Sequence, residues 1–188
     1  MRYIACRLAY EGSRFHGSQL QHNAFTVQQA LEEAIEKVCC HPARVILAGR
    51  TDAGVHALGQ CFRFATESTL PVERVSPALN ANLDKAVRVW EAREVKESFH
   101  PRYSALSRTY RYWIENAALG NVLLAHAVAV SREPLDVSMM QEAAQLLVGR
   151  HDFVSWQSAG SPTASTVRNV PRLQVRRLHH ILGSSFIE

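Results

Sequence analysis

Residues Ala48 to Gln60 read A-G-R-T-D-A-G-V-H-A-L-G-Q and separate two strand-like runs. The apolar run Val45-Ile46-Leu47 precedes them, and the alternating run from Gln60 to Phe64 follows. Three glycines in so short a stretch permit backbone conformations that other residues avoid. The pattern therefore predicts a shaped loop between two strands, which is a common place for functional side chains.

The same loop carries four polar side chains, Arg50, Thr51, Asp52 and His56. A carboxylate close to a cation stays ionised, so Asp52 is a candidate reactive group with Arg50 beside it. A purely structural interpretation stays open, in which Asp52 bonds to its own backbone in a turn and Arg50 is solvated.

The run from Gly49 to Ala57 (G-R-T-D-A-G-V-H-A) resembles the signature of the TruA family of tRNA pseudouridine synthases. In that family the aspartate of this loop is catalytic, so the resemblance implies that Asp52 is the catalytic residue. The family's neighbouring arginine helps to place the target nucleotide, and the resemblance implies that substrate-binding role for Arg50.

Composition bounds the other possibilities. With 188 residues, 47% of them hydrophobic, the chain can build one domain or two small halves. A net charge of +4 suits a polyanionic partner without requiring one. No opening charged-then-apolar segment indicates a signal peptide, and no apolar run reaches the length of a membrane span.

The chain has four cysteines, which show neither C-x-x-C spacing nor a disulfide-dense pattern: Cys6, Cys39, Cys40 and Cys61. We expect free thiols in a reducing cytosol, and hence a cytoplasmic protein. Adjacent cysteines rarely bind one ion together, and the histidines form no H-x-x-x-H pair. No metal site is predicted.

The first half of the chain alternates between strand and helix patterns. Strands are predicted over residues 2–10, 43–48, 60–65 and 86–94, and helices over 26–39 and 71–83. Thr26 and Gln29 form a capping box, and Pro77 is expected to shorten or kink the second helix. The order strand, helix, strand, strand, helix, strand predicts an α+β, ferredoxin-like half with both helices on one face of an antiparallel sheet.

The loop after the first strand and the segment after the first half also resemble the family. Gly17-Ser18-Gln19 matches a G-W-Q motif, with Ser18 where tryptophan is common. Phe99 to Ala105 (F-H-P-R-Y-S-A) matches an F-H-A-R-x-S-A segment, with Pro101 in place of the usual alanine.

Residues 108–114 (R-T-Y-R-Y-W-I) alternate with period 2 and predict a strand. Its tyrosines are either core residues or ligands for an aromatic base. The run resembles the family's R-x-Y-R-Y motif, in which the first tyrosine stacks on the target base, so the resemblance implies that Tyr110 binds substrate. Tyr112 is expected in the core.

The rest of the second half predicts a helix over 136–148, a strand over 170–178 and another strand from about 180. In this helix we expect Met140, Ala143, Ala144 and Leu147 to face inward and Gly149 to end it. His151 and Asp152 are interpreted as a structural brace rather than a second acid–base pair. We expect an N-terminal half, 1–105, with the catalytic loop, and a C-terminal half, 106–188, that is truncated, because the family continues with an arginine segment that no residue here matches.

The resemblance covers nearly the whole chain. It implies a pseudouridine synthase fold of two ferredoxin-like halves, a homodimer that shares one tRNA, and isomerisation of uridine at positions 38–40 of the anticodon stem-loop without cofactor or metal. Two alternatives stay open, an inactive truncated synthase and a non-catalytic RNA-binding module of the same fold. A glycoside hydrolase would use two carboxylates, and no second one stands in a comparable setting.

Overall fold

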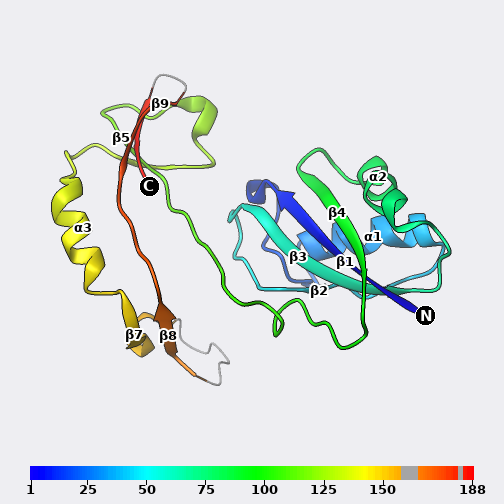
Figure 1. Cartoon of the computed structure of the whole chain (residues 1–188). Coiled ribbons are helices and arrows are strands. Elements are labelled where there is room, and N and C mark those ends of the chain that lie inside the picture. Colours follow the sequence, from blue (N-terminus) through cyan, green and yellow to red (C-terminus); the bar gives the residue numbers. More distant parts are fainter. Residues whose placement is uncertain (158–164, 182–183) are drawn as a thin grey trace. The chain divides into compact units, whose positions relative to one another are not determined.

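The computed structural model describes residues 1–157, 165–181 and 184–188. It divides into two compact units, Met1–Thr109 and Tyr110–Glu188, and each contains both helix and strand (Figure 1). The α+β class expected from the sequence is therefore confirmed.

Unit 1, Met1–Thr109, contains four strands and two helices. They are β1 (Arg2–Tyr10), α1 (Val27–Cys39), β2 (Ile46–Leu47), β3 (Ala57–Thr66), α2 (Val72–Asn82) and β4 (Val87–Val95). The strands lie in the order β2-β3-β1-β4, and every neighbouring pair is antiparallel. The order of elements predicted for this part of the chain is observed.

One face of this sheet forms the core of unit 1. Along β1, Ile4, Cys6, Leu8 and Tyr10 alternate inward, and each is at most 4% exposed. The two helices lie on this face (Figure 1), where Leu31 and Ile35 of α1 and Leu79 of α2 are fully buried. The sheet thereby holds both ends of the loop between β2 and β3 in place.

The predictions for the two helices of unit 1 are confirmed in part. Thr26 caps α1 by accepting a hydrogen bond from the Gln29 N–H (3.2 Å), but the Gln29 side chain donates to Glu33 instead of returning to Thr26. Only half of the capping box forms. Pro77 does not end α2, which continues to Asn82 because Val75 and Leu79 anchor its inner face.

β2 is shorter than the predicted strand over 43–48, and side chains of α1 explain why. Gln28 Nε2 donates to the Val45 carbonyl (3.2 Å), and Glu32 Oε1 accepts from the Val45 N–H (3.0 Å). Both backbone groups that strand pairing would use are thus satisfied by the helix. Regular strand pairing with β3 involves Ile46 and Leu47.

The described residues of unit 2, Tyr110–Glu188, form two separate sheets. Strands β5 (Ile114–Asn116), β6 (Ala129–Ser131), β9 (Arg177–Ile181) and β10 (Ser184–Ile187) form one, in the order β6-β5-β10-β9. β7 (Gly149–Asp152) pairs with β8 (Val167–Val170), and α3 spans Val137–Gln145. Within β10, Phe186 is fully buried, and its ring lies 5.9 Å from that of Trp113.

Three predictions for unit 2 are wrong. The strand expected over 108–114 is absent except for Ile114, because residues 108–112 form no backbone pairing with any described segment and, before Ile114, only the Trp113 carbonyl accepts a bond, from the Ala129 N–H (2.9 Å). Tyr112 is 71% exposed instead of buried. α3 ends at Gln145 and not at Gly149, because the N–H groups of residues 146–148 donate to carbonyls three residues back instead of four. Ala143, expected to face inward, is exposed. The strand expected over 170–178 is interrupted after Val170 by Pro171, which has no N–H to donate.

Candidate active site

The loop between β2 and β3 is tied down at its start by three hydrogen bonds. The Ala48 N–H donates to the Cys61 carbonyl (2.8 Å), and Gln60 Nε2 donates to the Gly49 carbonyl (2.9 Å). Arg108 Nη2 donates to the Ala48 carbonyl (2.9 Å), so the end of unit 1 also contacts this loop. The backbone that leads to Arg50 is therefore fixed.

Thr51 is held by the segment that follows β1. The Ser18 N–H donates to the Thr51 carbonyl (3.0 Å), and the Thr51 N–H donates to Ser18 Oγ (2.8 Å). The Thr51 hydroxyl lies 2.8 Å from the hydroxyl of Tyr10, which is 4% exposed at the end of β1. The residue immediately before Asp52 is thus bound through both its backbone and its side chain.

A tight turn follows Asp52. The Val55 N–H donates to the Asp52 carbonyl (3.2 Å), and Gly54 has φ +81°, a conformation that favours glycine. Gly12 packs so closely on this turn that a Cβ there would lie 2.0 Å from the Val55 carbonyl oxygen. The Gly12 N–H donates to His56 Nδ1 (3.2 Å), which makes this ring nitrogen an acceptor.

The side chains of Arg50 and Asp52 are both exposed on this loop. Within the part of the chain that the structure describes, neither makes a hydrogen bond or an ion pair, so the expected partnership between them is not formed. The alternative in which the Asp52 side chain bonds to its own backbone is not observed either. The carboxylate is left open to solvent on a loop that is otherwise fixed.

Tyr110 lies in unit 2, outside any strand, and is 82% exposed. Arg50 and Asp52 are brought together on one loop of unit 1. The pair His151 and Asp152 braces the backbone, as expected: His151 Nε2 lies 2.9 Å from the Val148 carbonyl, and Asp152 accepts from the Val154 N–H (3.1 Å).

Two thiols of unit 1, those of Cys6 and Cys61, are poor candidates for a nucleophile. Burial, together with the neighbouring Cys61, raises the pKa of the Cys6 thiol far above its ordinary value. Burial also raises the pKa of Cys61. Since the thiolate is the reactive form, both groups are inert near neutral pH.

Sequence reasoning did not find the residues that hold the loop, namely Tyr10, Gly12 and Ser18. Ser18 stood out only as a departure from a tryptophan. Glycines at 12 and 17, both just after a strand, were the available signal, because close backbone approach requires residues without a Cβ.

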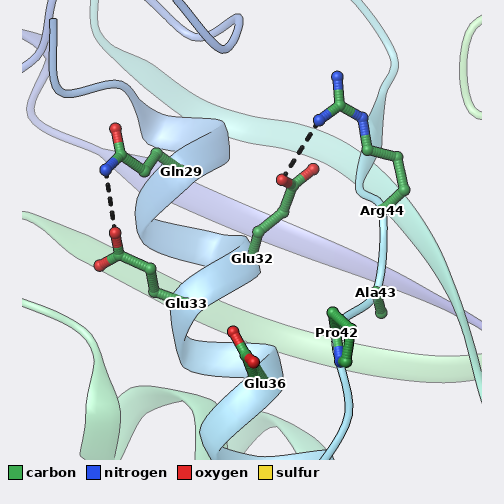
Figure 2. A pocket seen from close by; sticks show the side chains of 7 residues that line it. All are labelled: Gln29, Glu32, Glu33, Glu36, Pro42, Ala43 and Arg44. Atoms are coloured by element: carbon green, nitrogen blue, oxygen red, sulfur yellow. Dashed lines mark hydrogen bonds and ion pairs between the residues drawn. The ribbon is translucent and has the colours of Figure 1, made fainter. Parts of the chain in front are cut away.

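A shallow pocket of about 430 Å³ lies elsewhere in unit 1, between α1 and residues 42–44 (Figure 2). Its acidic side chains are partly paired: Glu32 with Arg44 (3.4 Å) and Glu33 with Gln29 (2.9 Å). None of the predicted site residues lines it, and its three glutamates disfavour a polyanionic ligand.

Among the described residues, no group of three or more His, Cys, Asp or Glu side chains could hold a metal ion. Over the same residues, no helix has the length and apolar character needed to cross a membrane.

Comparison with known proteins identifies the family. The sequence model described as tRNA pseudouridine synthase matches residues 7–104 and 143–187. The chain is 42% identical over 175 residues to tRNA pseudouridine synthase A of Pseudoalteromonas atlantica. The matched region covers 93% of this chain and 66% of that protein. It is 41% identical over 192 residues to the tRNA pseudouridine synthase A of Syntrophomonas wolfei, a match that covers 100% of this chain and 77% of that protein. It is 38% identical over 182 residues to a Coxiella burnetii protein of the same name, with 97% of this chain and 70% of that protein covered.

These matches define a class of RNA-modifying isomerase. The chain belongs to the tRNA pseudouridine synthase family. It spans about two thirds to three quarters of the length of these relatives.

Proposed function

We propose that this chain converts uridine to pseudouridine in the anticodon stem-loop of tRNA, at positions 38–40, with Asp52 as its catalytic residue. In this reaction the N1–C1′ bond breaks, the uracil turns, and a C5–C1′ bond forms. The hydrogen on C5 leaves as a proton, and N1 gains one, so atoms and charge balance. Nothing is oxidised and no phosphate is transferred, and the reaction therefore requires no cofactor or metal.

The observation that carries the proposal is the exposed Asp52 carboxylate on a fixed loop. Both roles open to it, attack on C1′ and removal of a sugar proton, use an ionised carboxylate held close to the ribose. Preorganisation of such a group avoids the cost of ordering it when the substrate arrives.

Arg50 and Tyr110 are proposed to bind the target nucleotide. Arg50 is exposed two residues before Asp52, where its guanidinium can fill the space left by an extruded base. The ring of Tyr110 is 82% exposed and offers a face on which the detached uracil can stack.

The wider architecture and setting belong to the same proposal. The strand order β2-β3-β1-β4 supports a ferredoxin-like N-terminal half, residues 1–105, and we assign residues 106–188 to a second half of that plan. We propose a cytoplasmic homodimer that shares one tRNA. Sedimentation velocity of the chain with and without tRNA tests the dimer, and a monomer under both conditions would contradict it.

The test of the reaction is release of tritium from anticodon stem-loop RNA labelled at uracil C5. The wild-type chain is expected to release tritium, and Asp52→Asn to release none. Asp152→Asn is the matched control, because its carboxylate lies in unit 2 and braces a turn, so its turnover should equal that of the wild type.

A binding measurement on the same RNA separates the alternatives. RNA binding by the wild-type chain without tritium release would contradict the proposal and favour one of the two alternatives without turnover, an inactive synthase or a non-catalytic RNA-binding module. Equal turnover by wild type and Asp52→Asn would remove Asp52 from the reaction.

A further inference from the structure

We infer that Ser18 is a positioning residue for Asp52, an inference that rests on the proposed function. Ser18 is 0% exposed and exchanges two close hydrogen bonds with Thr51, the residue before Asp52, while a third, from Ser18 Oγ to the Thr51 carbonyl, is long at 3.5 Å. Its backbone N–H donates to the Thr51 carbonyl, and its side-chain oxygen accepts from the Thr51 N–H. Together the two bonds fix the orientation of the peptide groups on both sides of Thr51.

We call this pair of hydrogen bonds between Ser18 and Thr51 the Ser18 clamp. The serine side chain makes a specific contribution to it. Its oxygen is the acceptor for the Thr51 N–H at 2.8 Å, whereas alanine would leave that N–H without this partner. Tryptophan, which is common at this position in the family motif, has only a donor in its side chain and could not accept the bond either. The side-chain half of the clamp is therefore a feature of this chain.

The clamp continues into the core of unit 1 through α1. The first N–H groups of a helix lack partners within the helix. Here the Val27 N–H donates to the Gly17 carbonyl (3.3 Å), and the Gln28 N–H donates to the Ser18 carbonyl (3.0 Å). Because α1 is anchored by fully buried side chains such as Leu31, Ser18 connects the Asp52 loop to a rigid element.

Close approach of the two segments depends on Gly17. Its φ is +86°, and a Cβ there would lie 2.9 Å from the Thr51 carbonyl oxygen. Tyr10 then contacts Thr51 from the end of β1 through the two hydroxyls. The residue before Asp52 is thus held by contacts from both α1 and β1, while the Asp52 side chain stays exposed.

A positioning role predicts a particular kinetic signature. Ser18 is fully buried and offers no surface to an RNA, so its loss should lower kcat and leave KM and RNA affinity unchanged. Misplacement of a catalytic group by about 1 Å can cost on the order of 100-fold in rate. We therefore expect Ser18→Ala to lower kcat by roughly 10- to 100-fold.

The experiment measures amide hydrogen exchange over residues 48–56 together with single-turnover tritium release. For Ser18→Ala we expect exchange at Thr51 to rise by roughly 10-fold or more, with no comparable change in β1 or α1. Ser18→Thr keeps the acceptor oxygen and should restore most of both readouts. Ser13→Ala is the matched control, since this exposed hydroxyl donates to the Glu11 carboxylate and not to the Asp52 loop, and it should match the wild type.

Unchanged exchange over 48–56 in Ser18→Ala overturns the inference, as does a rate that falls only in proportion to the unfolded fraction seen in a thermal melt. A wild-type chain that releases no tritium overturns the proposed function and with it the catalytic part of this inference. The exchange data then still decide whether Ser18 holds the loop.

Discussion

The two units differ in how well their sheets are covered. In unit 1 both helices pack on one face of a four-stranded sheet, and strands and helices contribute to one buried cluster. In unit 2 the buried apolar side chains among the described residues are Ala144, Phe186 and Ile187. This difference indicates which part of the proposed site is preorganised. Asp52 lies on a loop that is bonded to a dense core, whereas the ring of Tyr110 is not fixed by packing.

The largest expected effect compares two fully buried phenylalanines, Phe62 in β3 and Phe186 in β10. Phe62→Ala should destabilise unit 1 by about 3–5 kcal/mol, because a well-packed core cannot collapse around the cavity. Phe186→Ala should cost less, about 2–3 kcal/mol, since its sparser surroundings can relax. Urea titrations followed by hydrogen exchange in peptides from each unit measure both losses.

Equal losses for the two substitutions would break the comparison and show that unit 2 is packed as tightly as unit 1. Ile4→Val, a smaller deletion in the same core as Phe62, is the scale control and should cost about 0.5–1.5 kcal/mol.

The same contrast explains which parts of the fold the sequence predicts. Periodicity located β1, α1, β3, α2 and β4 because each buries one face against its neighbours, which is the condition that the pattern encodes. Residues 108–113 have an equally clear alternation but no strand, since alternation describes a face and not the hydrogen-bonding partner that a strand needs.

For the site, sequence located the loop but not its supports. Arg50 and Asp52 were predicted from one short motif, and both lie exposed on that loop. The Ser18 clamp joins residues 33 positions apart, and its serine is an ordinary polar residue in the sequence. Contacts of this kind depend on how strands and helices pack, which local pattern does not specify.

A second prediction compares two glycines that have little room for a side chain. A Cβ at Gly12 would lie 2.0 Å from a backbone atom, the Val55 carbonyl oxygen, whereas one at Gly120 would lie 2.7 Å from the end of the Val130 side chain. Gly12→Ala must move backbone and should cost about 2–3 kcal/mol, and Gly120→Ala about 1 kcal/mol or less. Thermal melts measure both.

Gly12→Ala should also reduce tritium release, because the turn after Asp52 would be displaced. Gly120→Ala should leave it unchanged. Normal turnover by Gly12→Ala would show that the Asp52 loop tolerates movement and would weaken the contrast between a fixed catalytic loop and an adaptable tyrosine.

A smaller effect is expected at the helix caps. Thr26 caps α1 through one hydrogen bond and is fully buried, whereas Asp136 caps α3 through two bonds, to the Ser138 and Met139 N–H groups, at the surface. Thr26→Ala should cost about 1–2 kcal/mol and Asp136→Ala about 0.5–1 kcal/mol. A larger loss for Asp136→Ala, measured by urea titration, would place the more important cap in unit 2.

The smallest effect is a pH dependence confined to unit 1. The Ala86 N–H (2.8 Å), followed by the Arg14 guanidinium (2.7 Å), lowers the pKa of Asp84 from its usual value of 3.8. A carboxyl whose pKa is lower in the folded state stabilises the fold above its unfolded pKa, and this contribution is lost as pH falls through the folded value. Unit 1 should therefore lose some stability below about pH 4, and only slightly, because the group is exposed.

Hydrogen exchange in peptides of unit 1, followed as the pH is lowered, measures this loss of stability at acid pH (the acid limb). Asp84→Asn should flatten the acid limb, whereas Glu36→Gln, which changes another exposed carboxylate of unit 1, should preserve it. If Asp84→Asn instead flattened the acid limb of unit 2 as well, the two units would unfold together, and the contrast between a dense and a sparse core would have to be drawn within one cooperative structure.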